Sequence, residues 1–162
     1  MRQWKPAASL DEAVSLTGQL PAEIVTRLKS VSAATLTTAL FKRGLRNQFL
    51  QNVHPLAAKE TMVGPAFTLR YIPAREDLNP LSVFEDPEHP QRVAVEQCPS
   101  GAVMVIDSRH NARAASAGAI LAARLQVRGA AGIVTDGGFR DSPEIAALDI
   151  PAYHQRPSSP TN

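Results

Sequence analysis

The chain has few cysteines and no long apolar run, and each shortage excludes a class of protein. A single cysteine, Cys98, occurs in 162 residues, which excludes an internal disulfide framework and fits a reducing compartment. We therefore expect a cytoplasmic protein. No apolar run reaches the roughly 18 residues of a membrane-spanning helix, and the N-terminus has no apolar signal-peptide core.

The chain also lacks an excess of one charge. It has 17 basic and 15 acidic side chains and a formal net charge of +2. No lysine- and arginine-rich block stands out, so we expect neither a nucleic acid nor a membrane as partner. A G-x-G-x-x-G loop after an early strand is absent as well, and the sequence therefore gives no support to a methyltransferase.

The length fits one domain over residues 1–162, large enough to bury about 68–70% of its unfolded surface. Residues 1–44 are expected to form a helical N-terminal part, in which Ser9 begins a capping box for the first helix. Pro21 suits the first position of a second helix, and Ser32 can cap a third that ends at Gly44. This part is interpreted as a packing or oligomer-contact arm.

Residues 73–92 are interpreted as a proline-rich insertion. The hydrophobic pattern is more regular before and after it. The four prolines of the insertion preclude a long element and allow at most a short helix around residues 81–84. Before it, residues 62–71 alternate as in a strand. The chain ends with a short helix at 144–148 and a strand at 150–153, and the open edge predicts a domain that is incomplete at the C-terminus.

Between these segments, the pattern predicts a strand, a helix and a second strand. The continuous apolar run at 102–106 predicts a buried strand, and a helix is expected from about 117 to 127. A further buried strand at 131–135 completes a βαβ unit with a parallel pair of strands. The large apolar side chains of the helix are expected to face inward; these are Ile120, Leu121, Leu125 and Val127.

The stretch Ala131–Asp141 carries the clearest functional pattern. After the buried strand, Gly137 and Gly138 can take positive φ and leave room for a ligand. Arg140 then offers a planar fork that grips a carboxylate, and Asp141 offers hard oxygens that suit a magnesium-type cation. The alternative is a surface turn with an exposed ion pair, which contributes little.

A helix N-terminus is expected to lie beside this turn. The first N–H groups of a helix have no intrahelical partner and carry the positive end of the helix dipole, so residues 118–121 could bind an anion. Ligands of α/β proteins bind at the carboxyl ends of the strands, and residues 118–121 should therefore converge with Arg140 and Asp141. The alternative is that Gly118 merely allows close packing.

The combination of GAIL at residues 118–121 and RGAAGIVTDGGFRD at 128–141 resembles the family of regulator of ribonuclease activity A and 4-hydroxy-4-methyl-2-oxoglutarate aldolase. Its longer-chain branch, with a proline-rich insertion and Gly-Ile-Leu at this helix, is most similar. The resemblance implies an α/β/β/α sandwich that assembles as trimers or multiples of trimers, with sites near subunit interfaces.

The aldolase branch implies a lyase that depends on Mg²⁺ or Mn²⁺, cleaves 4-hydroxy-2-oxo acids and decarboxylates oxaloacetate through a pyruvate enolate. Carried across, Arg140 would hold the substrate carboxylate beside the reacting carbonyl, and Asp141 would ligate the metal. The pyruvyl carboxylate would be held by backbone groups of four residues, namely Gly118, Ala119, Ile120 and Leu121.

The chain departs from the aldolases at one position. They carry an acidic residue after the helix glycine, where this chain has Ala119. Asp107 or His110 could replace that acid, but each could instead have a structural role. The family also includes non-catalytic regulators that inhibit a ribonuclease by contact. The sequence leaves both functions open, with the lyase as our first hypothesis.

Overall fold

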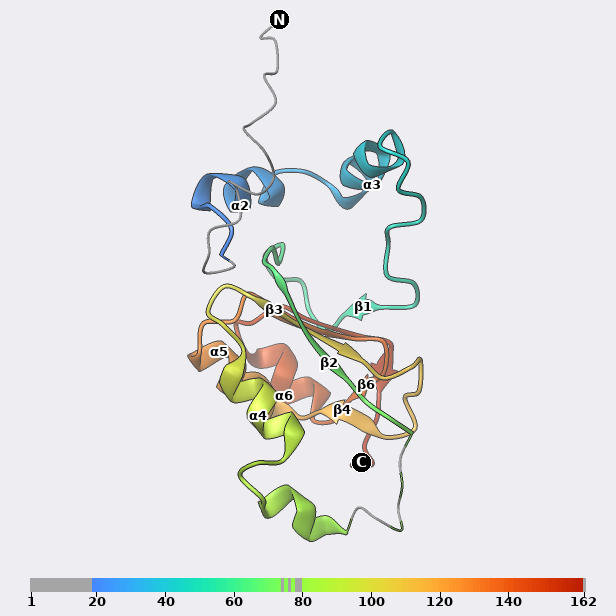
Figure 1. Ribbon diagram of the computed structural model, residues 1–162, viewed down its shortest axis with the longest axis vertical. Helices are drawn as coiled ribbons and strands as arrows, with labels where there is room; N and C mark the ends of the chain where they lie inside the picture. The colour runs from blue at the N-terminus through green and yellow to red at the C-terminus, as the bar shows by residue number, and fades with distance from the viewer. Residues whose placement is uncertain (1–18, 74, 76, 78–79, 162) are drawn as a thin grey trace, which may run out of the picture.

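Two sheets, whose strands alternate along the chain from residue 103 onward, form the centre of the fold. The computed structural model (Figure 1) describes residues 19–73, 75, 77 and 80–161. The fold is mixed α/β, as predicted. The first helix that the sequence predicted, near residues 9–17, lies outside the described residues.

The first sheet has five strands in the order β1-β7-β5-β3-β2. Their bounds are His54–Pro55 for β1, Ala66–Arg70 for β2, Val103–Asp107 for β3, Gly132–Thr135 for β5 and Ala152–His154 for β7. All neighbouring pairs are parallel except β1 and β7. The strands β3 and β5 are almost wholly buried, whereas β2 alternates between exposed and half-buried residues, as each pattern predicted.

The α/β/β/α sandwich implied by the resemblance contains a second sheet, but the residues that form its strands were not predicted from the sequence pattern. This second sheet consists of three short parallel strands in the order β4-β6-β8, with bounds Ala115–Ala117, Gly138–Phe139 and Arg156–Pro157. Each of them follows a strand of the first sheet, so that β3, β5 and β7 continue into β4, β6 and β8. The sequence placed these residues in loops and turns, because two or three residues are too few to show a strand period.

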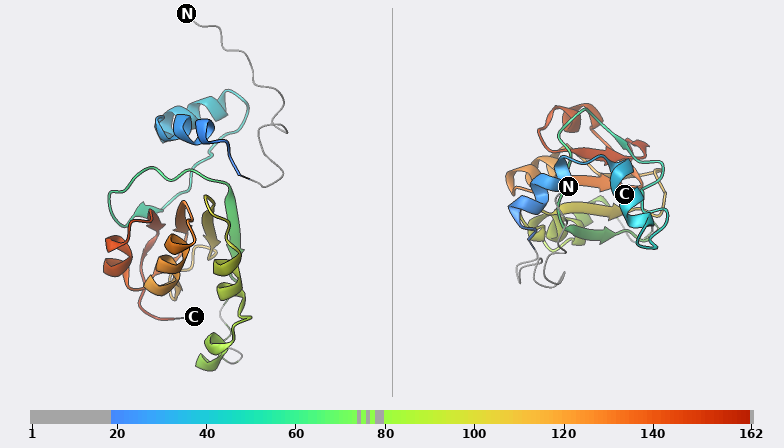
Figure 2. Two further views of the ribbon diagram at one scale, coloured as in Figure 1. Left: turned by 90° about the vertical axis from the view of Figure 1, so that its left-hand side faces the viewer. Right: turned by 90° about the horizontal axis from the view of Figure 1, so that it is seen from above.

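Three helices lie side by side and contact one another in chain order (Figure 2). They are α4 (Pro90–Gln97), α5 (Ala119–Val127) and α6 (Ser142–Ala147). The predicted βαβ unit is confirmed, since α5 connects the parallel neighbours β3 and β5. The insertion holds a 3₁₀ helix, η1 (Leu81–Glu85), where a short helix was expected, but its last residues already belong to α4.

The core lies between these helices and the sheets, and includes Met104, Leu125, Ile133 and Phe139 as fully buried side chains. The predicted inner face of α5 is wrong in part. Leu125 is buried as predicted, and the helix also buries Ala122. Ile120 and Val127, however, are 85% and 75% exposed.

The N-terminal helices α2 (Ala22–Lys29) and α3 (Ala33–Phe41) bury none of their residues and stand apart from the other helices (Figure 1). Ser32 caps α3 as predicted, accepting a hydrogen bond from Thr35 N–H at 3.2 Å. Pro21 precedes α2 as its N-cap instead of occupying the first helical position. Within the described ranges, every helix is too short or too polar to cross a membrane.

Candidate functional site

Arg140 and Asp141 follow the short strand β6 and contact the N-terminal end of α5. The backbone N–H of Arg140 donates to the carbonyl oxygen of Ala117 at 3.1 Å. The N–H of Ala119, in the first turn of α5, donates to Asp141 Oδ2 at 3.3 Å. The structure therefore brings residues 118–121 and the Arg140–Asp141 pair together, as expected. Their roles in binding a substrate and a metal stay predictions.

Gly118 is the N-cap of α5 and is required for this contact. A Cβ atom at Gly118 would lie 2.8 Å from Asp141 Oδ2 and 3.0 Å from Arg140 Cγ. Its backbone is extended, so glycine is needed here for space and not for conformation. The close-packing interpretation of Gly118 thus holds, and the packing itself places Arg140 and Asp141 against the helix end.

Asp141 is in an unusual local arrangement. It is the N-cap of α6 but has left-handed backbone angles, with φ 54° and ψ 38°, and its side chain makes no capping hydrogen bond. A left-handed backbone costs a residue other than glycine roughly 1–2 kcal/mol, and such residues cluster at functional sites. The carboxylate of Asp141 is thereby directed to α5 instead of to its own helix.

The side chains of Arg140 and Asp141 remain open to a ligand. Arg140 Nε lies 3.5 Å from Asp141 Oδ2, and the two side chains are 45% and 39% exposed. This separation is too long for a strong ion pair, and much of the guanidinium fork stays accessible. A carboxylate ligand could therefore bind Arg140 beside the Asp141 carboxylate.

The two glycines before this pair do not form the predicted ligand cradle. Neither Gly137 nor Gly138 has a positive φ. A Cβ at Gly137 would lie 2.6 Å from Ser116 Oγ, and one at Gly138 would lie 2.5 Å from Ser158 Cβ. The close approach that these glycines permit is to the chain's own serines: Ser116 belongs to β4, and Ser158 follows β8, the two neighbours of β6 in the second sheet.

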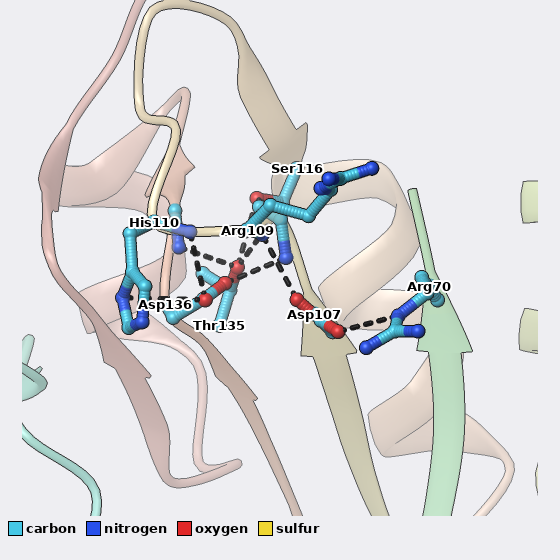
Figure 3. Close-up of polar contacts among 9 residues, drawn as sticks. Arg70, Asp107, Arg109, His110, Ser116, Thr135 and Asp136 are labelled. Carbon is cyan, nitrogen blue, oxygen red and sulfur yellow. Dashed lines mark hydrogen bonds and ion pairs between the residues drawn. The ribbon is translucent and has the colours of Figure 1, made fainter. Parts of the chain in front are cut away.

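A buried group of hydroxyls supports the turn between β5 and β6. Ser116 Oγ lies 2.7 Å from Ser108 Oγ and 2.8 Å from Thr135 Oγ1. Thr135 Oγ1 also accepts the N–H of Gly137 at 2.9 Å. Ser116 and Thr135 are both labelled in Figure 3, which draws their contacts. These bonds join the ends of β3, β4 and β5 and so fix where β6 begins.

The two candidates for a replacement acid lie at the end of β3 and in the loop that follows it: Asp107 is the last residue of β3, and His110 belongs to the loop. Asp107 accepts hydrogen bonds from Arg109 N–H at 2.9 Å and Arg70 Nε at 2.6 Å, and these bonds lower the pKa of its carboxyl group. His110 lies beside Asp136, which accepts its backbone N–H at 2.9 Å (Figure 3). These contacts support the structural alternative for both residues.

Arg140 and Asp141 also line a cavity of about 510 Å³. His154 and Ser158 line it, and His154 Nδ1 and Ser158 Oγ are buried without a hydrogen-bond partner in the described part of the chain. Burial, together with the nearby His54, lowers the pKa of His154. The sequence analysis missed both residues; the parallel arrangement of β7 and β5, which brings His154 to the carboxyl edge of the sheet, could have indicated one of them.

The site fits a cation that takes few protein ligands. Among the described residues, three or more His, Cys, Asp or Glu side chains never gather at one place where a metal could bind. Asp141 would therefore be the main protein ligand at this site, and its half-exposed carboxylate leaves space for water. Magnesium typically keeps several waters and uses one or two carboxylates, so the donor chemistry fits Mg²⁺ or Mn²⁺.

A family model described as RraA-like, Aldolase/RraA, matches residues 33–161. The chain belongs to the RraA-like family. The predicted family is thereby confirmed, and this family includes both metal-dependent aldolases and non-catalytic ribonuclease inhibitors. Membership alone does not choose between the two functions.

Solved structures of other RraA-like proteins have the same fold. Streptomyces coelicolor RraAS2, described as an unusual member of the RNase ES inhibitor RraA family, is 29% identical with a TM-score of 0.72 over 87% of this chain and 65% of that chain. The RNA-processing inhibitor RraA from Thermus thermophilis is 23% identical, with a TM-score of 0.57 over 78% and 69%.

A third similar structure is described as a methyltransferase and not as an RraA protein. A protein from Geobacillus kaustophilus described as S-adenosylmethionine: 2-dimethylmenaquinone methyltransferase is 26% identical, with a TM-score of 0.53 over 78% of this chain and 71% of that chain. A comparison with curated proteins finds no match. The chain thus spans 65% of the length of RraAS2, and any activity of the whole RraA-like protein is a proposal for this chain.

Proposed function

We propose that this RraA-like protein is a divalent-metal-dependent lyase that acts on small 2-oxo acids, with oxaloacetate decarboxylation as its main reaction. One observation carries the proposal. The carboxylate of Asp141 is directed away from its own helix and to the N-terminal end of α5, beside Arg140. A carboxylate grip, a metal ligand and a positive helix end are thus within reach of one small ligand.

The chain's own residues would bind and orient that ligand. Arg140 can hold a carboxylate with two parallel hydrogen bonds, and the first N–H groups of α5 favour negative charge. When bound at Asp141, Mg²⁺ or Mn²⁺ would supply positive charge beside the carbonyl oxygen on which negative charge develops. Decarboxylation needs this charge stabilisation and the orientation of the leaving carboxylate.

Aldol cleavage makes one further demand, because a base must take the hydroxyl proton. General acid–base help is typically worth 10²–10⁴-fold in rate. Ala119 cannot supply it. Asp107 accepts hydrogen bonds at the end of β3, and the backbone of His110 is held by Asp136. We therefore propose that cleavage of 4-hydroxy-4-methyl-2-oxoglutarate is weak or absent in this chain.

The second candidate is a non-catalytic regulator that inhibits a ribonuclease by contact. The 29% identity with RraAS2, whose description names an RNase ES inhibitor family, favours it, as does Ala119. For either function we propose a cytoplasmic protein that assembles as a trimer or a multiple of trimers, in which a neighbouring copy could complete the site.

Pyruvate formation from oxaloacetate, with and without Mg²⁺ or Mn²⁺, tests the lyase. Turnover above the protein-free metal background is expected, and Asp141→Asn should abolish it, because the amide is a poorer metal ligand, while the circular dichroism spectrum stays unchanged. Turnover in Asp141→Asn equal to that of the unmodified protein would contradict the assignment of Asp141.

Calorimetry separates the two candidate functions. Pyruvate added to the protein with Mg²⁺ should release or absorb heat if Arg140 and Asp141 form a 2-oxo acid site. Absence of heat at millimolar pyruvate would favour the regulator.

A further inference from the structure

The charged residues are distributed unevenly along the chain, although the net charge is small. Residues 24–59 contain six lysines and arginines and no acidic residue, whereas residues 76–91 contain five acidic residues and no lysine or arginine. The first stretch includes α3, and the second includes η1. A formal net charge of +2 for the whole chain therefore conceals one basic and one acidic surface.

The end of α3 and the residues after it, 41–50, form a surface that we call the basic arm. All of these residues are exposed. Four of them are large apolar side chains, each 50–60% exposed, namely Phe41, Leu45, Phe49 and Leu50. Three are basic, namely Lys42, Arg43 and Arg46. Exposed apolar side chains mixed with polar ones are typical of a surface that binds another protein.

The basic arm has little packing within its own chain. The helices α2 and α3 have eight and nine residues and bury none of them, and isolated helices shorter than about 12–15 residues are marginal in water. The guanidinium of Arg46 lies 4.6 Å from the centre of the Phe41 ring. Among the described residues, no carboxylate forms an ion pair with Lys42, Arg43 or Arg46. A partner that covers the arm would therefore supply both packing and negative charge.

Residues 81–88, which we call the acidic end, have the complementary properties. Glu85, Asp86 and Glu88 are exposed, and in the part of the chain that the structure describes none of them forms an ion pair. Leu81, at the start of η1, is 75% exposed. The acidic end thus presents three negative charges and an exposed apolar side chain.

The basic arm and the acidic end lie at opposite ends of the molecule. In Figure 1, α3 is at the upper end of the long axis, and η1, drawn in green below α4, is at the lower end. The turned view on the left of Figure 2 shows the same separation. The two surfaces of one chain therefore cannot contact each other, but each can contact the opposite surface of a second copy.

We infer that the basic arm of one copy binds the acidic end of a second copy of this chain. Complementary charges orient the two surfaces and exclude contacts between like surfaces, and the apolar side chains of the arm can cover Leu81. Because two different surfaces meet, the contact is head-to-tail, and repetition of it gives a closed ring or an open chain. A nucleic acid would pair with the basic arm alone and would leave the acidic end without a partner. The inference names two surfaces for the assembly proposed above and does not depend on the lyase reaction.

Charge reversal and its compensation in one chain test the contact. The first variant reverses the basic arm and carries Lys42→Glu, Arg43→Glu and Arg46→Glu. The second reverses the acidic end and carries Glu85→Lys, Asp86→Lys and Glu88→Lys. The third carries all six substitutions. Sedimentation over a range of protein concentrations measures association above the 17.4 kDa monomer. Each triple variant should associate at least tenfold more weakly than the unmodified protein, and the six-substitution variant should recover most of that loss, because its two surfaces are again complementary.

A matched control separates the contact from a general effect of net charge. Arg109→Glu, Arg113→Glu and Arg156→Glu together reverse three exposed arginines outside both surfaces, and this variant should associate like the unmodified protein. A six-substitution variant as weak as the triple variants would show that the basic arm binds something other than the acidic end, and would overturn the inference.

Salt dependence decides if circular dichroism shows that a triple variant is unfolded. Association of the unmodified protein should weaken at least tenfold between about 0.05 M and about 0.5 M NaCl, because salt screens exposed charges. Association that does not change with salt would overturn the inference.

The same measurement separates this inference from the proposed assembly. If the unmodified protein and all variants associate equally, the proposed assembly stands and the contact between the basic arm and the acidic end is wrong. If the unmodified protein stays at the mass of a monomer, both fail, and pyruvate formation from oxaloacetate still tests the lyase by itself.

Discussion

At the scale of single residues, the site depends on side chains that are directed away from their usual local partners. An aspartate before a helix ordinarily accepts a hydrogen bond from the first turn of that helix. Asp141 does not; its carboxylate reaches Ala119 N–H, 22 residues away in the sequence. Its left-handed backbone makes this direction possible, and aspartate tolerates that conformation better than most residues.

Arg140→Lys should remove most lyase activity although it keeps the positive charge. The guanidinium binds a carboxylate with two parallel hydrogen bonds, and an ammonium cannot reproduce this geometry. A loss of at least tenfold in kcat/KM for oxaloacetate is expected, measured by pyruvate formation. Arg109→Lys, in the loop after β3, is the matched control and should retain activity, since nothing in the proposed site contacts its side chain. Equal activities in both variants would contradict the role of Arg140.

Ala119→Asp should raise aldol cleavage relative to decarboxylation. The new carboxylate would supply the missing base at the N-terminal end of α5, where the helix dipole favours negative charge. The ratio of the two rates should rise at least tenfold, measured on one preparation with one metal so that folding defects cancel. Efficient cleavage by the unmodified protein would show that another group already acts as base.

The sequence predicted that Arg140 and Asp141 lie beside the N-terminal end of α5, but it did not predict all the residues around them. Gly137 and Gly138 were interpreted as a ligand cradle because glycine permits the close approach of another group. The sequence does not show which group lies against them. Here it is Ser116 and Ser158. The sequence did not identify His154 as a residue near the site, because its position there depends on which strands are neighbours in the sheet.

At the scale of helices and strands, the length of each element decided whether it could be predicted from the sequence. The buried strands β3 and β5 and the connecting helix α5 were foreseen, because each has enough residues to show its pattern. The strands β4, β6 and β8 were missed because two or three residues show none. The prediction of the inner face of α5 was wrong in part, because the helix packs through the small side chain of Ala122. The prediction considered large apolar side chains and so included Ile120, which is exposed.

The contact between α5 and the end of β6 can be tested through Gly118. Gly118→Ala would place a methyl group 2.8 Å from Asp141 Oδ2, so Asp141 or the helix must move. We expect at least a tenfold loss of pyruvate and Mg²⁺ affinity in calorimetry, with a much smaller change in Tm, because the displaced side chains are partly exposed. Gly44→Ala, which removes a glycine of positive φ far from the site, controls for a general loss of stability. Unchanged affinity in Gly118→Ala would contradict the proposed geometry.

At the scale of the whole molecule, the parallel strands bring chemically useful residues to one edge of the first sheet. Arg70, Asp107 and His154 are the last residues of β2, β3 and β7, and the connections to the second sheet begin there. His154 also faces His54 across the antiparallel pair of β7 and β1. The same residue thus lines the cavity beside Arg140 and Asp141 and belongs to the seam that holds the edge strand.

The stability of the protein should depend on the protonation of His154. The folded state lowers the pKa of this histidine, so the unfolded chain binds a proton more readily. The free energy of unfolding should therefore fall as the pH drops below about 6.5, the ordinary histidine pKa, and continue to fall until the folded pKa is reached. Above pH 7 this effect is absent.

Thermal unfolding at pH 7.5 and pH 5.5 checks this dependence. The decrease in Tm between the two conditions should be smaller by a few degrees in His154→Gln than in the unmodified protein. An identical decrease in both proteins would contradict a role for His154 in acid destabilisation.

The order of strands in the first sheet also has a consequence for folding. The pairing of β3 with β5 joins residues such as Val103 and Gly132, whereas β1 pairs with β7 through His54 and His154. The entropy cost of closing a loop rises with its length, so the segment that carries Arg140 and Asp141 can close early. During synthesis from the N-terminus, β1 then has no partner until β7 is made, and the edge of β5 stays uncovered in the meantime. Such an unpaired, apolar edge is a template for pairing with another chain, and slow translation just before residues 152–154 would lengthen the time during which the nascent chain can aggregate.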